Sequence, residues 1–234
     1  NDEIVDVKVE EEETEEERKA REEEEKSQKE EEARKEALKD VTAEEGDMVM
    51  VDILGKTIED DDEGVVFQAS NPEDAKKLLN YEESKKDQYT NELAIIGKKG
   101  FLQDKIDEAI QDGMKFFEEK TIELEPEDAF GKREGSKIEK VSAKKFMKDM
   151  DGERPYRGAT YRDKKGRTGT VIRAAQGRCL VDFNHPLAGK KVSYTINLTD
   201  KIEGFENQAK ALLARRLGGQ THFADEFKID HDAT

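Results

Sequence analysis

Two alternating segments that lie far apart in the chain constrain its fold more than any other feature. Residues 121–124 alternate apolar and polar side chains, and so do residues 191–198. Pro126 ends the first segment, and residues 125–190 are far too many for a hairpin loop. We therefore expect two strands of one domain, with a second small domain, residues 136–189, inserted in the connection between them.

The N-terminal region has a different composition from the rest. Residues 10–36 contain fifteen Glu against seven Lys or Arg, with no proline or glycine. Many Glu residues precede a basic residue by four positions, and each such pair stabilises an isolated helix by roughly 0.2–0.5 kcal/mol. The pattern predicts a solvated helical extension over residues 1–44. A charged spacer is the favoured interpretation, and an arm that docks on a basic partner such as a ribosomal surface is the alternative.

Overall composition excludes several classes. The net charge of −17 argues against contact with a nucleic-acid backbone. The single cysteine, Cys179, excludes an internal disulfide and fits a reducing, cytoplasmic compartment. No apolar run approaches the roughly 20 residues that span a bilayer, and the acidic N-terminus does not resemble a secretory signal.

Further periodicities predict individual elements. We expect a strand from Met48 that ends at Gly55, helical structure over residues 71–93, and a short amphipathic helix through residues 102–110. Strands are expected over residues 167–173 and 178–183, joined by a turn at 174–177. A C-terminal helix is expected over residues 205–217, and residues 223–229 can form a last strand.

Several of these segments also contain distinctive sequence motifs. They read GDMVMVDILGK at 46–56, VVF at 65–67, GFLQDKIDEAIQDGMKFFEEKTIELEPEDAFGKREGSKIEKV at 100–141 and VDFNHPLAGKKVSYTINL at 181–198. This order resembles the FKBP family of peptidyl-prolyl cis–trans isomerases, in its SlyD-like branch with an insert-in-flap domain, and within that branch the long archaeal members. The resemblance covers roughly residues 45–203.

The resemblance implies an α+β fold, in which one helix packs across a curved antiparallel sheet. The isomerase domain would comprise residues 45–135 and 190–203, and residues 136–189 would be a mostly-β inserted domain that binds clients. The charged N-terminal helix, residues 1–44, and a C-terminal helical appendage, residues 204–234, lie outside the family core.

The family pocket is an apolar cup, and the resemblance places eight residues in it. Carried over position by position, they are Ile53, Phe67, Gln68, Leu102, Gln103, Ile106, Phe130 and Tyr194. For Ile53, Leu102 and Ile106, membership of the barrel core is an equally good interpretation.

The chain departs from the family pattern at several positions, some of them in this cup. Gln68 stands where aspartate is usual, Ile106 replaces an aromatic floor residue, and Lys105 and Phe117 replace glycines. Gln103 replaces an isoleucine whose backbone amide holds the substrate carbonyl. These departures make weak catalysis an open alternative.

The inserted domain supplies a second candidate site. Exposed methionine and aromatic side chains adapt to varied partners, so an exposed apolar face would hold unfolded chains. Its proposed client-binding residues are Val141, Phe146, Met147, Met150 and Tyr156. We expect at least two of them to be exposed together, and the competing interpretation places each in the small core of the insert.

Other chemistry is weakly indicated. His185, Cys179, His222 and His231 lack metal-ligand spacing, so no metal or cofactor is expected. The expected function is a peptidyl-prolyl isomerase with chaperone activity, whose partners are unfolded or nascent polypeptides that contain proline. The alternatives are a catalytically weak holding chaperone and a protein docked on a ribosome or another assembly, and the oligomeric state stays open.

Overall fold

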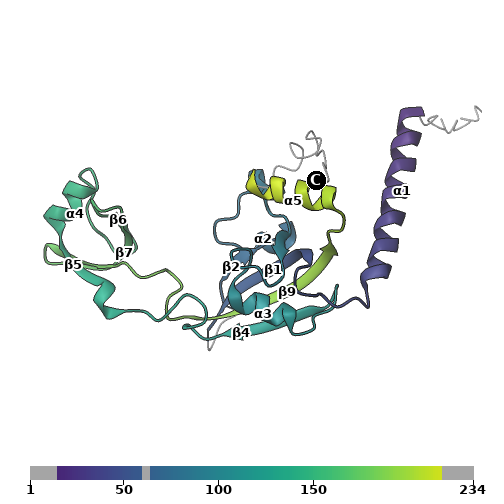
Figure 1. Ribbon diagram of the computed structural model, residues 1–234. Helices are drawn as coiled ribbons and strands as arrows, with labels where there is room; N and C mark the ends of the chain where they lie inside the picture. The colour runs from purple at the N-terminus through teal and green to yellow at the C-terminus, as the bar shows by residue number, and fades with distance from the viewer. Residues whose placement is uncertain (1–14, 60–63, 218–234) are drawn as a thin grey trace, which may run out of the picture.

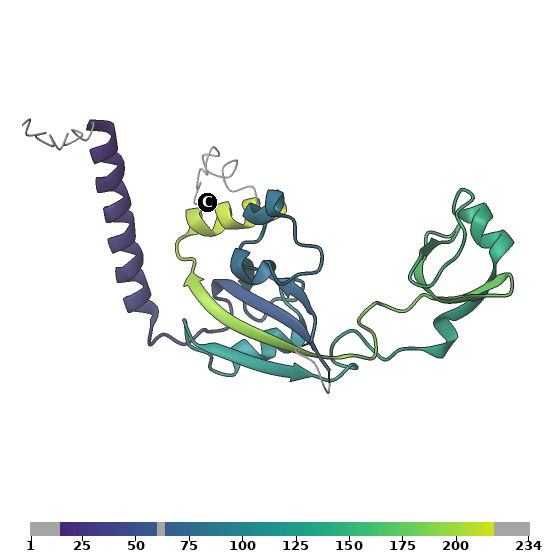
Figure 2. The same ribbon diagram turned by 180° about the vertical axis from the view of Figure 1, so that it is seen from behind.

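The computed structural model describes residues 15–59 and 64–217. Figures 1 and 2 show a central sheet, with helix α1 (Glu15–Leu38) at one end and a second sheet at the other. Both sheets are antiparallel and the helices are few, so the expected α+β class is confirmed. None of the described helices is long and apolar enough to cross a membrane. The strand expected at residues 223–229 lies outside the described residues.

The central sheet is organised around two long strands, β1 (Met48–Ile58) and β9 (Lys191–Lys201). They pair along nearly their whole length, and β4 (Glu119–Leu124) pairs with the far edge of β9. The opposite edge of β1 pairs with β3 (Glu92–Ile95) through its first residues and with β2 (Val66–Ala69) beyond Ile53. The two alternating segments, 121–124 and 191–198, are therefore neighbouring strands, with Ile122 opposite Tyr194.

Helix α3 (Asp104–Gln111) covers one face of this sheet. Ile106 and Ile110 lie on the same side of the helix, and both are buried. They pack with alternate residues of the long strands, among them Val51, Ile196 and Leu198. The period-two pattern of the strands and the period near four of the helix thus meet in a single apolar core.

Two of the expected elements were wrong. The first strand does not end at Gly55, because β1 continues to Ile58 and pairs with β9 throughout. Residues 71–93 are mostly not helical: their only helices are α2 (Pro72–Ala75) and a 3₁₀ helix at Glu83–Gln88. Of the apolar side chains that suggested a helix there, Ala75 is buried but Leu79 is 87% exposed.

Both ends of the described chain contact the central sheet. In α1, the Arg34 Nη2 atom donates a hydrogen bond to the Lys201 carbonyl at 2.7 Å, and the Arg34 Nε atom lies 2.9 Å from an Asp200 carboxylate oxygen. Helix α5 (Phe205–Arg216) is held by Arg215, whose guanidinium stacks over the Phe101 ring at 4.2 Å and donates to the Gly100 carbonyl. The C-terminal helix therefore joins the central sheet.

Phe117 adopts the backbone conformation of the glycine it replaces. Its φ is +62°, a region that costs a non-glycine residue about 1–2 kcal/mol. Its N–H donates to the Leu198 carbonyl at 2.9 Å, and its side chain lines the groove between α1 and the sheet together with Leu38 and Met50. This apolar contact offsets the strain, and it explains how phenylalanine is accommodated there.

The segment between β4 and β9 forms its own sheet, and we call residues 136–189 the distal unit. Its strand order is β5 (Ile138–Ser142), β8 (Arg178–Asp182), β7 (Thr168–Ala175) and β6 (Thr160–Arg162). Helix α4 (Ala143–Asp149) covers one face, where Phe146 stacks on Tyr161 with ring centroids 5.2 Å apart. The unit thus has a core separate from that of the central sheet.

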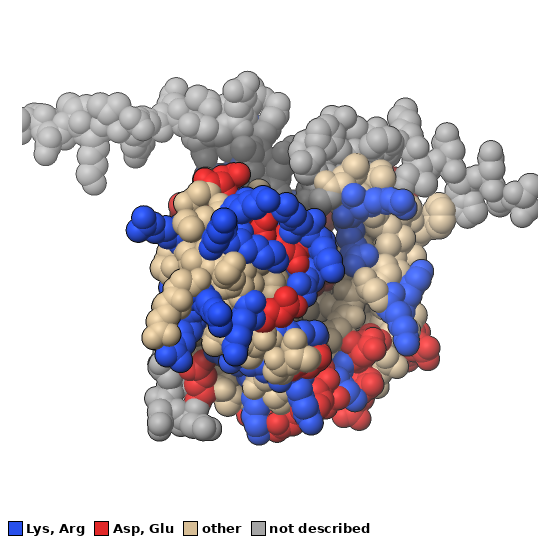
Figure 3. Space-filling model, turned by 90° about the vertical axis from the view of Figure 1, so that its left-hand side faces the viewer, with Lys and Arg blue, Asp and Glu red and all other residues tan. Residues whose placement is uncertain are grey.

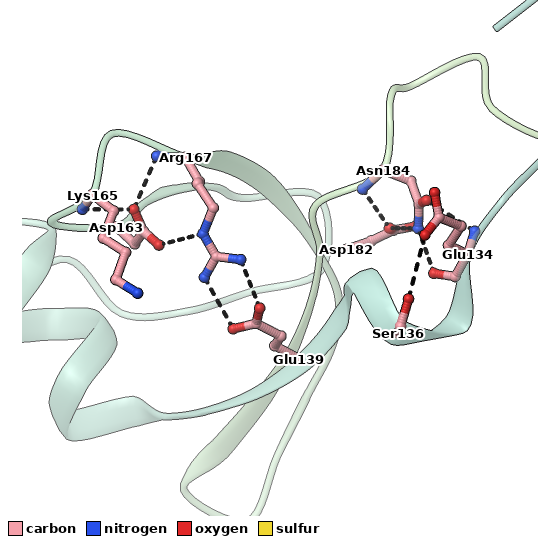
Figure 4. A network of polar contacts seen from close by, with 8 residues as sticks. All are labelled: Glu134, Ser136, Glu139, Asp163, Lys165, Arg167, Asp182 and Asn184. Atoms are coloured by element: carbon pink, nitrogen blue, oxygen red, sulfur yellow. Dashed lines mark hydrogen bonds and ion pairs between the residues drawn. The ribbon is translucent and has the colours of Figure 1, made fainter. Parts of the chain in front are cut away.

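Polar contacts join the two chain segments that enter and leave the distal unit (Figure 4). Asn184 accepts a hydrogen bond from the Glu134 N–H and donates one to the Glu134 carbonyl, each at 2.9 Å. Arg133 donates to the Asp182 carboxylate at 2.8 Å. The amide of Asn184 thereby holds the entering and leaving segments side by side.

A second network, also in Figure 4, fixes the β6–β7 turn. Asp163 accepts hydrogen bonds from the backbone N–H groups of Lys165 and Arg167 and from the Arg167 Nε atom, and Arg167 also binds Glu139. Burial by itself would raise the pKa of Asp163, but the hydrogen bonds from Arg167 and Lys165 outweigh it and lower that pKa.

We expect the free energy of unfolding of the distal unit to fall in acid because of Asp163. Its folded-state pKa lies below the unfolded value of about 3.9, so its stabilising effect is present above that pH and is lost as the pH falls through the folded pKa. In Asp163→Asn, hydrogen exchange of the β6 and β7 amides should lose part of this acid dependence. Asp151→Asn, at an exposed aspartate of the same unit, should keep it, and equal profiles for the two variants would contradict the assignment.

Candidate functional site

A pocket of about 380 Å³ opens where α3 begins, beside β1, β9 and the loop after β4. Seven of the eight residues assigned to the cup line it, and the eighth, Phe67, packs directly behind two of them. The complete lining is Ile53, Gln68, Glu92, Phe101, Leu102, Gln103, Ile106, Ala129, Phe130 and Tyr194.

Three aromatic rings form one wall. The Phe67 ring meets the Phe130 ring edge-to-face at 5.5 Å and the Tyr194 ring edge-to-face at 5.7 Å between centroids. Such pairs contribute about 0.5–1.5 kcal/mol each beyond their buried area. Phe67 therefore fixes the positions of the two rings that face the pocket.

The floor is aliphatic and is shared with the core. Ile53 is 1% exposed and Ile106 is 2% exposed, and both line the pocket while packing in the central core. Leu102 is half-buried at the start of α3. For the two isoleucines the core and pocket interpretations both apply, because one side chain serves both.

Polar groups are confined to the rim. The Gln68 Nε2 atom donates to a Glu92 carboxylate oxygen at 2.9 Å, so a carboxylate is present beside the position where the family usually has aspartate. Burial, with a smaller contribution from the Glu92 charge, raises the pKa of Tyr194 to about 12. The Tyr194 hydroxyl is therefore protonated at neutral pH and can donate a hydrogen bond.

Gln103 links α3 to the loop after β4. Its Nε2 atom donates to the Asp128 carbonyl at 2.9 Å, one residue before Ala129 and two before Phe130. Its own backbone N–H has no hydrogen-bond partner within the part of the chain that the structure describes. The side chain thus braces the loop, and the N–H is free to meet a carbonyl in the pocket.

Three contributors to this site are not evident from the sequence. Glu92 belongs to no motif, yet it orients Gln68. His185 lies within the FNHPLAG word, and its ring stacks on Phe130 with centroids 4.7 Å apart and planes within 2°. Gly55 lies beneath the aromatic wall, where an added Cβ would be 2.8 Å from the Phe67 ring and 3.0 Å from the Tyr194 ring.

The five client-binding candidates fall into two groups. Val141 and Phe146 are buried at 4% and 0% exposure in the core of the distal unit, so their assignment to an exposed surface was wrong. The spacing of an apolar helix face is the same whether that face meets a core or a client. Met147 and Met150 are half-buried, and Tyr156 is 66% exposed.

No cluster of three or more side chains suited to a metal ion occurs among residues 15–59 and 64–217. His222 and His231 lie outside the described residues. The pocket itself consists of apolar surface with a few hydrogen-bonding groups at its rim.

Known proteins are similar in sequence to parts of this chain. The short-type peptidyl-prolyl cis–trans isomerase of Methanocaldococcus jannaschii is 32% identical over 155 residues, which cover 66% of the chain and 91% of that protein. The FKBP-type 16 kDa peptidyl-prolyl cis–trans isomerase of Escherichia coli K12 is 38% identical over 93 residues, 38% of the chain and 60% of that protein. The chain belongs to the FKBP-type peptidyl-prolyl cis–trans isomerases. No protein-family model matches it.

Membership of this family confirms the expected enzyme class, a peptidyl-prolyl isomerase. The Gln68–Glu92 pair is one polar feature that distinguishes this pocket from the usual family pattern, and Gln103 is another.

We expect Gln68→Ala to lower kcat/KM for a proline peptide by about two- to tenfold. The variant loses the hydrogen bond between Gln68 and Glu92 at the rim of the pocket, and one hydrogen bond contributes about 0.5–1.5 kcal/mol. A protease-free isomerisation assay measures the effect. Gln88→Ala, at an exposed glutamine outside this pocket, is the matched control and should have wild-type activity. Equal rates for both variants would show that Gln68 has no part in catalysis.

Proposed function

We propose that this protein catalyses prolyl cis–trans isomerisation in unfolded or nascent polypeptides, and that its distal unit holds those clients near the pocket. The observation that carries the catalytic part is the composition of the pocket: an aliphatic floor of Ile53 and Ile106, an aromatic wall, and polar groups only at the rim.

The chemistry needs no nucleophile, acid or metal. Rotation about the prolyl bond crosses a barrier of about 18–20 kcal/mol set by amide resonance. Twisting the bond removes the charge separation of the planar amide, so an apolar pocket favours the twisted form over the planar one. In this proposal the proline ring lies on Ile106 between Phe130 and Tyr194, and the Gln103 N–H donates to the carbonyl of the substrate.

The distal unit would act as an inserted client-binding domain. Support comes from Tyr156, which is largely exposed, and from Met147 in α4 and Met150 at its C-terminal end, which are both only half-buried. Two binding surfaces on one chain make the second encounter intramolecular, which raises the local concentration of prolyl bonds at the pocket. Clients held by apolar contacts at the unit would therefore be isomerised faster than short peptides.

Two substrates test the two parts separately. A tetrapeptide reports on the pocket alone, and refolding of a proline-limited protein reports on the pocket and the distal unit together. Substitution of Met147, Met150 and Tyr156 by serine should slow catalysed refolding severalfold and leave the tetrapeptide rate unchanged. Loss of neither rate would contradict client binding by these residues. Suppressed aggregation without isomerisation of either substrate would identify a holding chaperone on an isomerase fold.

A further inference from the structure

Charge is strongly segregated between the distal unit and the remainder of the chain. Residues 136–189 contain thirteen Lys or Arg against six Asp or Glu, a net charge of +7. The other residues together carry −24. The overall charge of −17, on which the expectation of no nucleic-acid contact rested, is thus an average over two parts of opposite sign.

Most of the basic side chains in the distal unit are exposed and make no ion pair. Arg167 and Lys137 bind carboxylates, whereas the remaining eleven form no salt bridge among the described residues. We call these eleven residues the basic surface: Lys140, Lys144, Lys145, Lys148, Arg154, Arg157, Arg162, Lys164, Lys165, Arg173 and Arg178. Figure 3 shows Lys and Arg side chains spread over the outward end of the unit.

The acidic residues of the unit scarcely counter this surface. Asp163 and Glu139 are bound to Arg167, Asp182 is bound to Arg133, and Asp149 accepts a hydrogen bond from the Tyr161 hydroxyl. Only Asp151 and Glu153 are exposed acids of the unit without such a partner among the described residues. The available charge at this end of the molecule is therefore predominantly positive.

The position of the unit separates this charge from the acidic helix α1. The unit and α1 lie at opposite ends of the central sheet in both views (Figures 1 and 2). At physiological ionic strength, exposed charges are screened beyond about 8 Å. A polyanion that meets the distal unit is thus attracted locally, and the acidic helix at the far end does not repel it.

An aromatic side chain lies within the basic surface. Tyr156 is 66% exposed, and Arg154 and Arg157 flank it in the loop after α4. An exposed ring beside guanidinium groups matches the way proteins hold unpaired nucleic-acid strands, because the ring stacks on bases and the cations contact phosphates.

We propose that the basic surface of the distal unit binds single-stranded RNA. An extended strand carries one charge per nucleotide, so it can contact cations that are spread over α4, the 151–158 loop and the β6–β7 turn. A polypeptide with isolated acidic residues would meet only a few of them. This binding site is separate from the isomerase pocket and does not depend on isomerase activity.

The test measures binding of the full chain to a fluorescent mixed-sequence 20-nucleotide RNA by anisotropy at several salt concentrations. The key variant carries Arg154→Gln, Arg157→Gln, Lys164→Gln and Lys165→Gln. The control variant carries Lys56→Gln, Lys76→Gln, Lys86→Gln and Lys99→Gln, at exposed lysines of the central part without ion pairs among the described residues, and has the same net charge.

We expect the key variant to bind at least tenfold more weakly at 50 mM salt, and the control less than threefold more weakly. The slope of log affinity against log salt should become shallower by about 0.7 for each phosphate that the variant no longer neutralises. Isomerisation of a tetrapeptide should be unchanged in both variants. No binding by the wild type up to 100 µM, or equal weakening in both variants, would overturn the proposal.

Two further experiments identify the class of partner. Poly-glutamate at the same charge concentration should compete poorly, and equal competition would replace RNA by an acidic polypeptide. Tyr156→Ala should weaken single-stranded binding about tenfold through loss of stacking and leave duplex binding unchanged. Equal weakening for single strands and duplexes would contradict a single-strand site.

Discussion

Replacement of Phe130 by alanine should lower kcat/KM for a proline tetrapeptide about thirtyfold. The Phe130 ring lines the pocket, forms an edge-to-face pair with the Phe67 ring and stacks on the His185 ring. Its removal takes about 2 kcal/mol of apolar contact from the bound proline ring, which corresponds to that loss of rate. The protease-free isomerisation assay measures it directly.

Phe130→Tyr is the matched control, because it keeps the aromatic ring. Phe130→Ala also loses the ring contacts with Phe67 and His185, so its activity should be measured well below its own unfolding temperature, which separates loss of catalysis from loss of fold. Wild-type activity in Phe130→Ala with an intact fold would remove this wall from the site.

Gly55→Ala should damage both stability and activity. The new Cβ would lie 2.8 Å and 2.9 Å from two carbons of the Phe67 ring and 3.0 Å from the Tyr194 ring. Overpacking of this kind costs about 1–3 kcal/mol, and here it displaces the two aromatic residues that shape the wall. We expect a lower free energy of unfolding in urea and at least a tenfold lower kcat/KM.

Two companion variants make this result specific. Gly135→Ala introduces a Cβ with nothing within 4 Å, so stability should change by less than about 0.5 kcal/mol. Gly55→Ala combined with Phe67→Leu should recover part of the lost stability, because the smaller side chain leaves room for the Cβ. Additive losses in the double variant would show that the two residues do not interact.

The central part of the fold follows largely from local pattern. The alternation of residues 121–124 and 191–198 predicts strands, and the structure pairs them directly. The apolar spacing of Leu102, Ile106 and Ile110 predicts α3. These elements could be predicted because each buries one face against one core, which imposes a regular period on the sequence.

Between β2 and β3, the spacing of apolar residues did not predict the structure correctly. Ala75, Leu78 and Leu79 have helical spacing, yet the chain continues as a helix only through Ala75. Buried contact on that side is limited, and Leu79 is almost fully exposed. With so little apolar surface to bury, the spacing alone does not stabilise a longer helix.

Contacts between segments that are distant in the sequence could not be predicted either. Glu92 and Gln68 meet because β2 and β3 pair with the same edge of β1. His185 reaches Phe130 because the chain leaving the distal unit returns beside the loop that enters it. Neither pair has a signal in its own neighbourhood of the sequence.

Catalysis of prolyl isomerisation by the apolar pocket is most directly tested with the wild-type protein and a proline tetrapeptide, by NMR exchange spectroscopy without a coupled protease. The uncatalysed reaction takes tens of seconds. We predict cis–trans exchange that becomes faster in proportion to protein concentration, with shifted resonances at Phe130, Leu102 and Tyr194. Exchange at the uncatalysed rate in the presence of folded protein would contradict this prediction.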